Sequence, residues 1–360
     1  MRVRRSSIVV GLVGLVLLVV AVLTRFVVLP AGQKLPKSTD VSVQYTGTGT
    51  FLDANALAAG DMEHALAKDV PVSIDRRTYV KSVHGDHAIV GDDVTVRAGG
   101  PPQTNRHTYA LDRTSLAGVA SPDGTVVEPT SGSLPVAWPI GPSPSAQYQL
   151  YDTATQRGWP GKYLGAGSTD GRSTYRFTYV ADAALKDPTV VKSLPAALPK
   201  GLLSSLSPLL ATETAGRLTA ALPSLPANVP ISYTARTTVV AVVDQQTGLV
   251  VDTTQDQRII ASVADAGRAI QLLPVMSVKV KLTSASVTEL ADKAASGGRL
   301  LILIGVVAPL ALAAVGLLLI IVAVIRRTRT AANPSAAGAA SDRPTAPAVK
   351  ESVRAEADRD

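Results

Sequence analysis

The sequence predicts a mainly antiparallel β domain that carries a helical insertion and is tethered by a transmembrane helix at each end. Uncharged apolar runs, from Ile8 to Leu23 and from Leu300 to Ile325, lie near the two ends of the 360-residue chain. About 20 apolar residues cross the hydrocarbon core of a bilayer. Between the runs, strand–turn–strand patterns dominate, which favours an antiparallel sheet over alternating strands and helices.

Positive charge predicts the orientation of the two spans. Arginines precede the first run and follow the second, and such residues stay in the cytoplasm. A cleaved signal peptide is the alternative for the first run, but no small-x-small site directly follows it. We therefore expect a double-pass plasma-membrane protein with five parts: a cytoplasmic N-terminus (1–7), a first span (8–29), an extracytoplasmic domain (30–298), a second span (299–325) and a disordered cytoplasmic tail (326–360).

Composition narrows the possible functions of the central domain. There is no cysteine, so thiol chemistry and disulfides are excluded, and the domain must be stabilised by its own core, as one unit or two. The net charge of +7 falls mainly in the cytoplasmic flanks, because Arg25 to Arg299 holds 25 Lys and Arg against 23 Asp and Glu. We therefore expect no nucleic-acid partner.

Strand patterns fill the first half of the central domain. Val41–Thr50 alternates β-branched and small residues and predicts a strand, whereas Ala54–Ala67 has helical spacing broken by a glycine. Val70–Val83 and His87–Arg97 flank a turn of sequence HGDH and predict a hairpin. Further strands are predicted at Tyr109 and Leu111, at Val126 and Val127 after the turn Ser121–Gly124, at Gln147–Tyr151 within a Pro-rich segment, and at Ser173–Val180.

The residues from Pro188 to Pro230 form the predicted helical insertion. Seven prolines and many leucines replace the alternating pattern there. Ser207 followed by Pro208 is typical of a helix N-cap and first turn, so we predict a helix from Pro208 to about Leu222.

Strand patterns return after the insertion. Ser232–Asp244 and Leu249–Ile260 bracket a loop whose Gly248 suits a hairpin, and Val275–Val287 predicts a last strand. Thr288–Ser296 then leads as a helix into the second span.

Four segments resemble the actinobacterial membrane family of PorA-like porins. They are Tyr109–Ser115 (YALDRTS), Pro139–Thr155 (PIGPSPSAQYQLYDTAT), the Leu/Pro-rich Leu194–Pro230, and Val239–Gln255 (VVAVVDQQTGLVVDTTQ). The resemblance covers nearly the whole chain and implies a cell-envelope protein. The layout also resembles CD36-type scavenger receptors, which implies a lipid tunnel inside a β-rich ectodomain.

The densest group of titratable side chains is His84, Asp86, His87, Asp92 and Asp93. Such a group could bind zinc, but its place at a hairpin tip favours a solvated turn. Asp112-Arg113 and Asp75-Arg76-Arg77 suggest structural ion pairs, with anion binding as the alternative. His64 and His107 have no recognisable partners.

The chain contains no familiar catalytic motif. Ser168 lacks the first glycine of a nucleophile elbow, and Gly47–Thr50 (GTGT) lacks the third glycine of a dinucleotide loop. We therefore expect no enzyme activity, no cofactor and no metal. A hydrolase that uses dispersed residues is a further alternative.

Leucines of the insertion form the candidate ligand site. Burial against the sheet is the simpler interpretation, and lining an apolar opening or a partner surface is the functional one. We expect Leu210 to lie in the core and Leu206 to be exposed, because Leu206 precedes the proposed cap. The proposed ligand-binding residues are Leu202, Leu203, Leu206, Leu209 and Leu210. The expected ligand is apolar, such as an envelope lipid; the alternative is a non-catalytic scaffold that binds envelope proteins.

Overall fold

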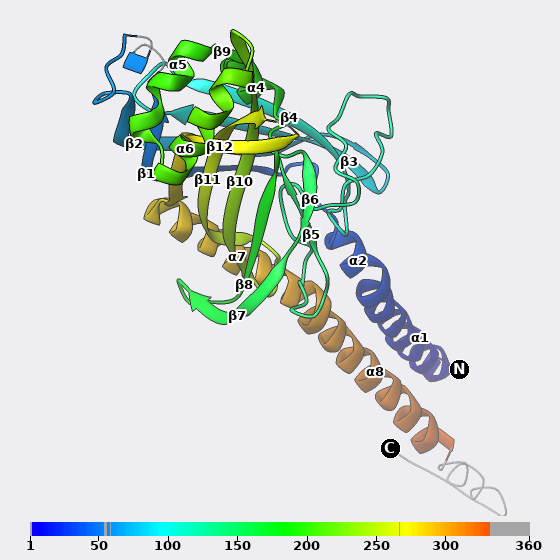
Figure 1. The fold of residues 1–360 in the computed structure, drawn as a ribbon. Coiled ribbons are helices and arrows are strands. Elements are labelled where there is room, and N and C mark those ends of the chain that lie inside the picture. Colours follow the sequence, from blue (N-terminus) through cyan, green and yellow to red (C-terminus); the bar gives the residue numbers. More distant parts are fainter. Residues whose placement is uncertain (1, 54–55, 58, 266, 332–360) are drawn as a thin grey trace, which may run out of the picture. The chain divides into compact units, whose positions relative to one another are not determined.

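The computed structural model describes residues 2–53, 56–57, 59–265 and 267–331 (Figure 1). The chain divides into two compact units. One contains the two ends, up to Arg25 and from Val306 onward, and the other runs from Phe26 to Gly305. Most of the tail predicted to be disordered, from residue 332 onward, lies outside the described residues.

Helices α1 (Arg2–Leu23) and α8 (Ala308–Ala331) form the unit of the two ends. They belong to two stretches, Leu12–Gly32 and Ser284–Arg327, that are long and apolar enough to cross a membrane. Gly14 and Gly316 let the two backbones touch: a Cβ atom at Gly14 would lie 2.6 Å from the carbonyl oxygen of Gly316. Small residues permit this close approach between membrane helices.

An antiparallel sheet dominates the Phe26–Gly305 unit, which confirms the predicted β class. Its hydrogen-bonded order is β4-β3-β2-β1-β12-β11-β10-β8-β7, and a short strand β9 pairs with β10. The strands are β1 (Asp40–Leu52), β2 (Leu66–His84), β3 (His87–Arg97), β4 (Gln103–Asp112), β7 (Lys162–Thr169), β8 (Arg172–Ala184), β9 (Ala197–Pro199), β10 (Asn228–Asp244), β11 (Val250–Asp265) and β12 (Arg268–Leu282).

Two predicted turns form where the sequence places them. His84 and His87 are paired across the β2–β3 turn, and the loop after Asp244 joins β10 to β11. Asp244 accepts hydrogen bonds from the backbone N–H groups of Gln246 and Thr247, and Gly248 follows with a φ of 71°. A carboxylate next to a left-handed glycine is the chemistry that such a loop requires.

Helices and a small hairpin pack around the sheet. The hairpin of β5 (Gln149–Asp152) and β6 (Arg157–Pro160) forms a separate two-stranded sheet. Helix α7 (Ser284–Ile302) follows β12, with the Thr283 hydroxyl as its N-cap. Short π-helical segments, Thr24–Val28 and Leu303–Val307, occur where the chain passes from one unit to the other.

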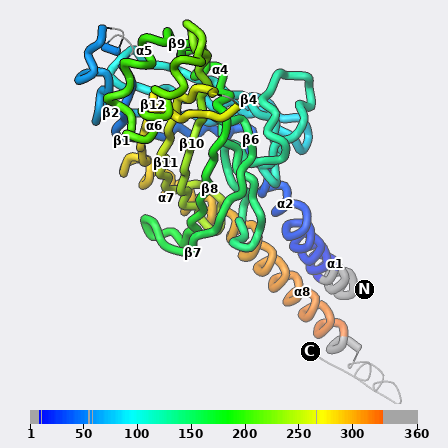
Figure 2. The backbone as a smooth tube through the Cα atoms, in the orientation of Figure 1, coloured from blue at the N-terminus to red at the C-terminus, as the bar shows by residue number. Residues whose placement is uncertain are grey.

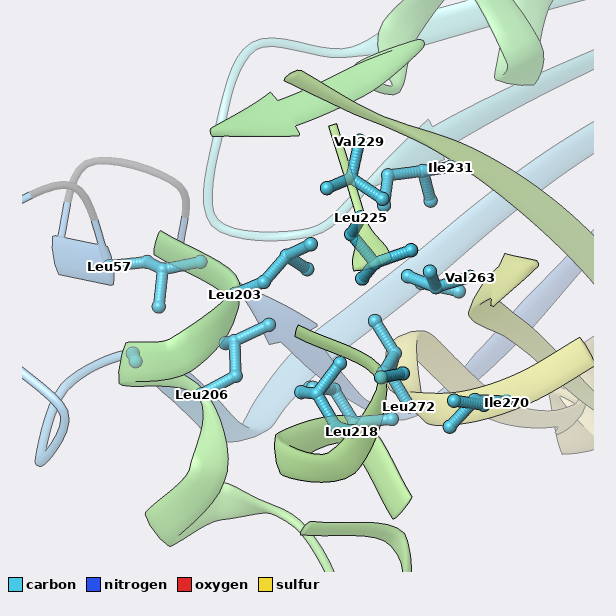
Figure 3. Close-up of a cluster of buried hydrophobic side chains, with 14 residues drawn as sticks. Leu57, Leu203, Leu206, Leu218, Leu225, Val229, Ile231, Val263, Ile270 and Leu272 are labelled. Carbon is cyan, nitrogen blue, oxygen red and sulfur yellow. The ribbon is translucent and has the colours of Figure 1, made fainter. Parts of the chain in front are cut away.

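The predicted insertion is helical and contributes an apolar cluster at one end of the sheet (Figures 1 and 2). It contains α4 (Pro188–Ser193), α5 (Lys200–Ser205), a 3₁₀ turn (Ser207–Leu209), α6 (Thr212–Ala221) and a second 3₁₀ turn (Leu222–Ser224). Leu203, Leu206 and Leu218 pack there with residues of β10, β11 and β12, such as Ile231, Val263 and Leu272 (Figure 3).

Some predicted boundaries are wrong. The helix expected from Pro208 begins at Thr212, because Leu210 and Ala211 have extended backbone. In the segment expected to be helical from Ala54 to Ala67, only residues 56 and 57 are helical among those described. Gly60, with a φ of 76°, reverses the chain before β2 begins at Leu66.

Two predicted strands also differ from the structure. Val126 and Val127 are not in a strand, and Val126 is 91% exposed. The strand expected from Val275 to Val287 begins earlier, at Arg268, and ends at Leu282, where the cap of α7 begins.

Candidate functional site

A cavity of about 1110 Å³ lies inside the Phe26–Gly305 unit, against one face of the large sheet. Along several strands, such as β1, β2 and β3, mainly alternate residues line it, as the period of two in a β-strand requires. The lining is mostly apolar, and a few polar side chains interrupt it. From β1, β2 and β3, for example, it receives Val41, Val43 and Tyr45; Ile74, Arg76 and Thr78; and Val90, Asp92 and Val94.

The sheet is curled so that strands far apart in its order share this cavity. The charge of Arg76 on β2 acts on the hydroxyls of Tyr45 and of Tyr179, although Tyr179 lies on β8, five strands away from β2. Glycines on the cavity side of β1 suit such curvature, since they remove side-chain bulk. A Cβ atom at Gly47 would lie 2.0 Å from the carbonyl oxygen of Lys279 on β12.

Elements outside the sheet supply the remaining walls of the cavity. Leu150 and Tyr151 of the β5–β6 hairpin line it, and the Tyr151 ring packs edge-on against Tyr109 of β4. Leu290 and Ala294 of α7 also line it. The N-terminus of α7 is fixed to β1, because the backbone N–H of Gln44 donates to the Ser286 hydroxyl and the N–H of Thr283 donates to the Gln44 carbonyl, both at 2.9 Å.

Arg76 and Asp92 form an ion pair on the cavity wall. Arg76 donates through Nε and Nη2 to the two carboxylate oxygens of Asp92, at 2.8 and 2.9 Å, and the Thr78 hydroxyl donates to the same carboxylate at 2.9 Å. Burial opposes the charge of Arg76, but Asp92 outweighs this effect and raises the pKa of the guanidinium. The Asp92 side chain is 1% exposed and that of Arg76 is 30% exposed. The guanidinium is therefore the more accessible member of the pair from the cavity.

His107 is a second buried polar group on the wall. Its Nδ1 lies 2.5 Å from Oε1 of Glu128, and the Tyr151 hydroxyl donates to Oε2 of Glu128 at 3.3 Å. Burial disfavours protonation of His107, but the hydrogen bond and charge of Glu128 outweigh burial and raise the pKa of the imidazole. The contact between His107 and Glu128 joins β4 to the irregular segment that contains Glu128.

Two aspartates at the wall serve the backbone and nearby side chains. Asp187 caps α4 by accepting from the N–H groups of Thr189 and Val190, and it also accepts from the side chain of Asn105 at 3.2 Å. Asp152 accepts from the N–H and hydroxyl of Thr155, at 2.8 and 2.7 Å. Burial raises the pKa of Asp152 despite these hydrogen bonds.

The five leucines proposed as ligand-binding residues do not line this cavity. Leu203 and Leu206 are buried in the cluster of Figure 3, and Leu202, Leu209 and Leu210 are partly buried against it. The expected division is therefore reversed: Leu206 is 2% exposed, because the 3₁₀ turn directs it into the cluster, and Leu210 is less buried. A role of these leucines in ligand binding stays a prediction that no observation tests.

The cluster of histidines and aspartates near the HGDH turn is separated by the fold. His84 and His87 face each other at the turn, and His84 pairs with Asp123 at 3.0 Å. Asp92 points instead into the cavity wall beside Arg76, and Asp86 pairs with Lys34. No group of three potential metal ligands occurs among the residues that the structure describes.

The ion pairs suggested by neighbouring residues form with other partners. Arg77 pairs with Asp40, and Asp75 pairs with Arg97. Asp112 accepts from the N–H groups of Thr114 and Ser115. Arg113 donates to the backbone carbonyls of Leu35 and Gly85.

Comparisons with known proteins give one family and no informative structural relative. The sequence profile described as porin PorA matches residues 6–325. No curated protein matches the sequence. Similar solved structures include an acyl-CoA thioesterase II, TesB2, from Mycobacterium marinum (11% identity, 67% of this chain and 79% of that chain, TM-score 0.13) and a MaoC-like dehydratase (11% identity, 68% and 75%, TM-score 0.12). At these TM-scores neither structure supports an inference about the fold or function of this chain.

Proposed function

The chain belongs to the porin PorA family, and from this premise we propose that it is a non-catalytic protein of the cell envelope that binds an apolar ligand, such as an envelope lipid. The ligand site is the cavity of the Phe26–Gly305 unit. Two apolar helices anchor the protein in the membrane, so the domain works beside a lipid reservoir. The proposal needs neither a metal nor a cofactor.

The cavity is the observation that carries the proposal. Sites for small molecules usually occupy about 300–1,000 Å³ and combine an apolar lining with a few polar groups. This cavity, of about 1110 Å³, has such a lining. Interiors of proteins are otherwise close-packed, so a void of this size in an apolar lining favours a ligand that fills it.

The outer face of the sheet supports binding inside the domain rather than a pore made by strands that cross the membrane. Strands that face lipid carry apolar side chains outward. Here many outward positions carry charged residues, among them Asp75, Arg77, Asp93, Arg97, Arg176, Asp182, Arg236, Asp256, Arg258, Lys279 and Lys281. Some pair across strands, as Arg236 does with Asp182 at 3.8 Å. Such a face belongs in water.

Mass spectrometry of the purified full-length protein tests the proposal. The protein is extracted in detergent, and bound lipid is identified by native mass spectrometry and by analysis of the extracted lipids. We expect one lipid class to be retained above its share in the membrane. If no lipid is enriched in repeated preparations, the proposed function is wrong.

A non-catalytic scaffold remains the alternative function, and one observation favours it. Strand β7 is at the edge of the sheet, and Tyr163 and Leu164 on it are 37% and 43% exposed, with Val180 of β8 nearby at 47%. Exposed apolar side chains at a sheet edge suit pairing with another protein. Crosslinking in cells from residue 180, with loss of the adduct in Leu164→Glu, would support this alternative.

A further inference from the structure

Three side chains that line the cavity keep hydrogen-bond donors that no described residue accepts. Arg76, Tyr45 and Tyr179 all line it, from β2, β1 and β8. Tyr45 is a diagonal neighbour of Arg76 on the adjacent strand, because Arg76 lies opposite Val43 and Tyr45 lies opposite Ile74. The charge of Arg76 also acts on the hydroxyl of Tyr179, across the cavity. Neither hydroxyl makes a hydrogen bond to any residue that the structure describes. They are also absent from the fully enclosed polar atoms, so they open onto the void.

Arg76 has donors left over after it has paired with Asp92. The pair uses Nε and one N–H of Nη2, whereas Nη1 makes no hydrogen bond to the described residues. A guanidinium offers five N–H groups, so up to three remain. Asp92 also lines the cavity, but its carboxylate already accepts from Arg76 and Thr78 and is only 1% exposed. A molecule in the cavity therefore meets donors.

Apolar residues flank these donors along the sheet, and the charge of Asp152 also acts on Tyr179. Arg76 lies directly opposite Val43 on β1 and Val94 on β3. Tyr45 lies opposite Ile74 and Leu282, and Tyr179 lies opposite Val239. Burial raises the pKa of Tyr179, so its hydroxyl keeps its proton and can donate.

Because Asp92 already balances the charge of Arg76, the site offers hydrogen bonds without a net positive charge. A carboxylate bound there would be an uncompensated charge in an apolar cavity, which is costly. An uncharged carbonyl accepts the same hydrogen bonds without that cost. A ligand that lacks an acceptor binds less well, because it removes water from these donors without replacing the lost hydrogen bonds.

We propose that Arg76, Tyr45 and Tyr179 form a binding centre for an uncharged acceptor, the ester carbonyl of an acyl lipid, with the acyl chain along the apolar lining. The inference rests on the proposed function and specifies which lipids the cavity selects. It predicts a preference for an acyl ester over the corresponding free acid and over the corresponding hydrocarbon.

Tryptophan fluorescence can test this selectivity. The chain has two tryptophans, and Trp138 lines the cavity whereas Trp159 does not. In the full-length Trp159→Phe protein in lipid nanodiscs, quenching of Trp138 reports on brominated chains in the cavity. The probes are methyl 9,10-dibromostearate, 9,10-dibromostearic acid and 9,10-dibromooctadecane. Tyr45→Phe and Tyr179→Phe remove one hydroxyl each, and Tyr175→Phe on β8, outside the lining, is the matched control.

We expect the methyl ester to bind more tightly than the other two probes. Tyr45→Phe and Tyr179→Phe should each weaken ester binding about threefold to tenfold, the effect of one lost hydrogen bond, and leave the hydrocarbon unchanged. Tyr175→Phe should change neither. Equal ester binding in all variants, or a free acid that binds as tightly as the ester, would overturn the inference but leave the proposed function intact. Absence of quenching by every probe would instead contradict the proposed function.

Discussion

Polar side chains on the inner face of the sheet are the least expected residues of this domain. Asp92 and His107 lie directly opposite each other on β3 and β4, and Thr78 lies opposite Asp92 on β2. A strand that faces a core normally places apolar residues inward, so a polar row inside the sheet is costly unless every group is paired. Asp92 and His107 are paired, and both line the wall of the cavity.

His107 should make the stability of the domain depend on pH. Its pKa is raised in the folded protein, so its contribution is complete below the unfolded pKa of about 6.5 and disappears as pH rises through the folded pKa. His107→Gln should therefore lower the free energy of unfolding by about 1.5–3 kcal/mol at pH 5.5 and by less at pH 9. Chemical unfolding at both pH values measures this difference.

His64→Gln is the matched control for that measurement. His64 pairs with Asp61 at 2.8 Å, but its side chain is 74% exposed. Exposed ion pairs contribute little to stability, so this substitution should be nearly neutral at both pH values. A loss at His107 that is equal at pH 5.5 and pH 9 would contradict the proposed pairing with Glu128.

Leu206 should be far more sensitive to charge than Leu210. Leu206→Asp would place an unpaired carboxylate in the closed cluster of Figure 3 and should cost more than about 3 kcal/mol. Leu210→Asp can turn toward water, because Leu210 is only partly buried, and should cost roughly 1 kcal/mol. Thermal unfolding of the two variants gives the comparison; equal losses would show that Leu210 belongs to the core as well.

At the level of helices and strands, the sequence predicted types better than boundaries. The hairpins around His84–His87 and around Asp244–Gly248 were predicted correctly, because their turn residues act locally. The helix expected at Pro208 depended on a Ser-Pro pair, and the pair instead starts a 3₁₀ turn that directs Leu206 inward. That outcome depends on contacts with β10 to β12, which no local pattern contains.

The cavity could not be predicted from the sequence for a related reason. Arg76 and Tyr179 are far apart in the chain and five strands apart in the sheet, so only the curl brings them together. The local sequence feature that indicates the curl is the pair Gly47 and Gly49 on the cavity side of β1, since glycines inside a strand often mark a bend. The sequence instead assigned Asp92 to a solvated turn. The structure places Asp92 on β3, where it pairs with Arg76 in the cavity wall.

The contact between Gly14 and Gly316 should hold the two membrane helices together. Gly14→Leu would force α1 and α8 apart and should destabilise their association by about 1–3 kcal/mol. Val13→Leu, at a neighbouring position that is 46% exposed, is the control and should be neutral. Titration of the full-length protein with SDS in mixed micelles compares them, and equal stability of the two variants would exclude the glycine contact.

The orientation of the complete chain in the membrane is a separate prediction. Because the native chain contains no cysteine, single cysteines at Ser6, Ser121 and Ser341 can be probed with a membrane-impermeant thiol reagent. The positive charges that flank both apolar runs predict that only position 121 is labelled in intact cells. Labelling at 6 or 341 would reverse or break the double-pass arrangement.

Neighbouring valines of β10 allow the most direct test of ligand binding in the cavity. Val239 lines the cavity, whereas the side chain of Val240 points to the opposite face of the sheet. Val239→Trp should fill part of the void, and Val240→Trp should leave it open. Both full-length variants are purified in parallel with the native protein, their folding is compared by circular dichroism, and bound lipid is quantified by mass spectrometry.

If the cavity holds the ligand, Val239→Trp should lose most of the lipid that the native protein retains, and Val240→Trp should keep it. Equal lipid in the two folded variants would place the ligand elsewhere and contradict this account.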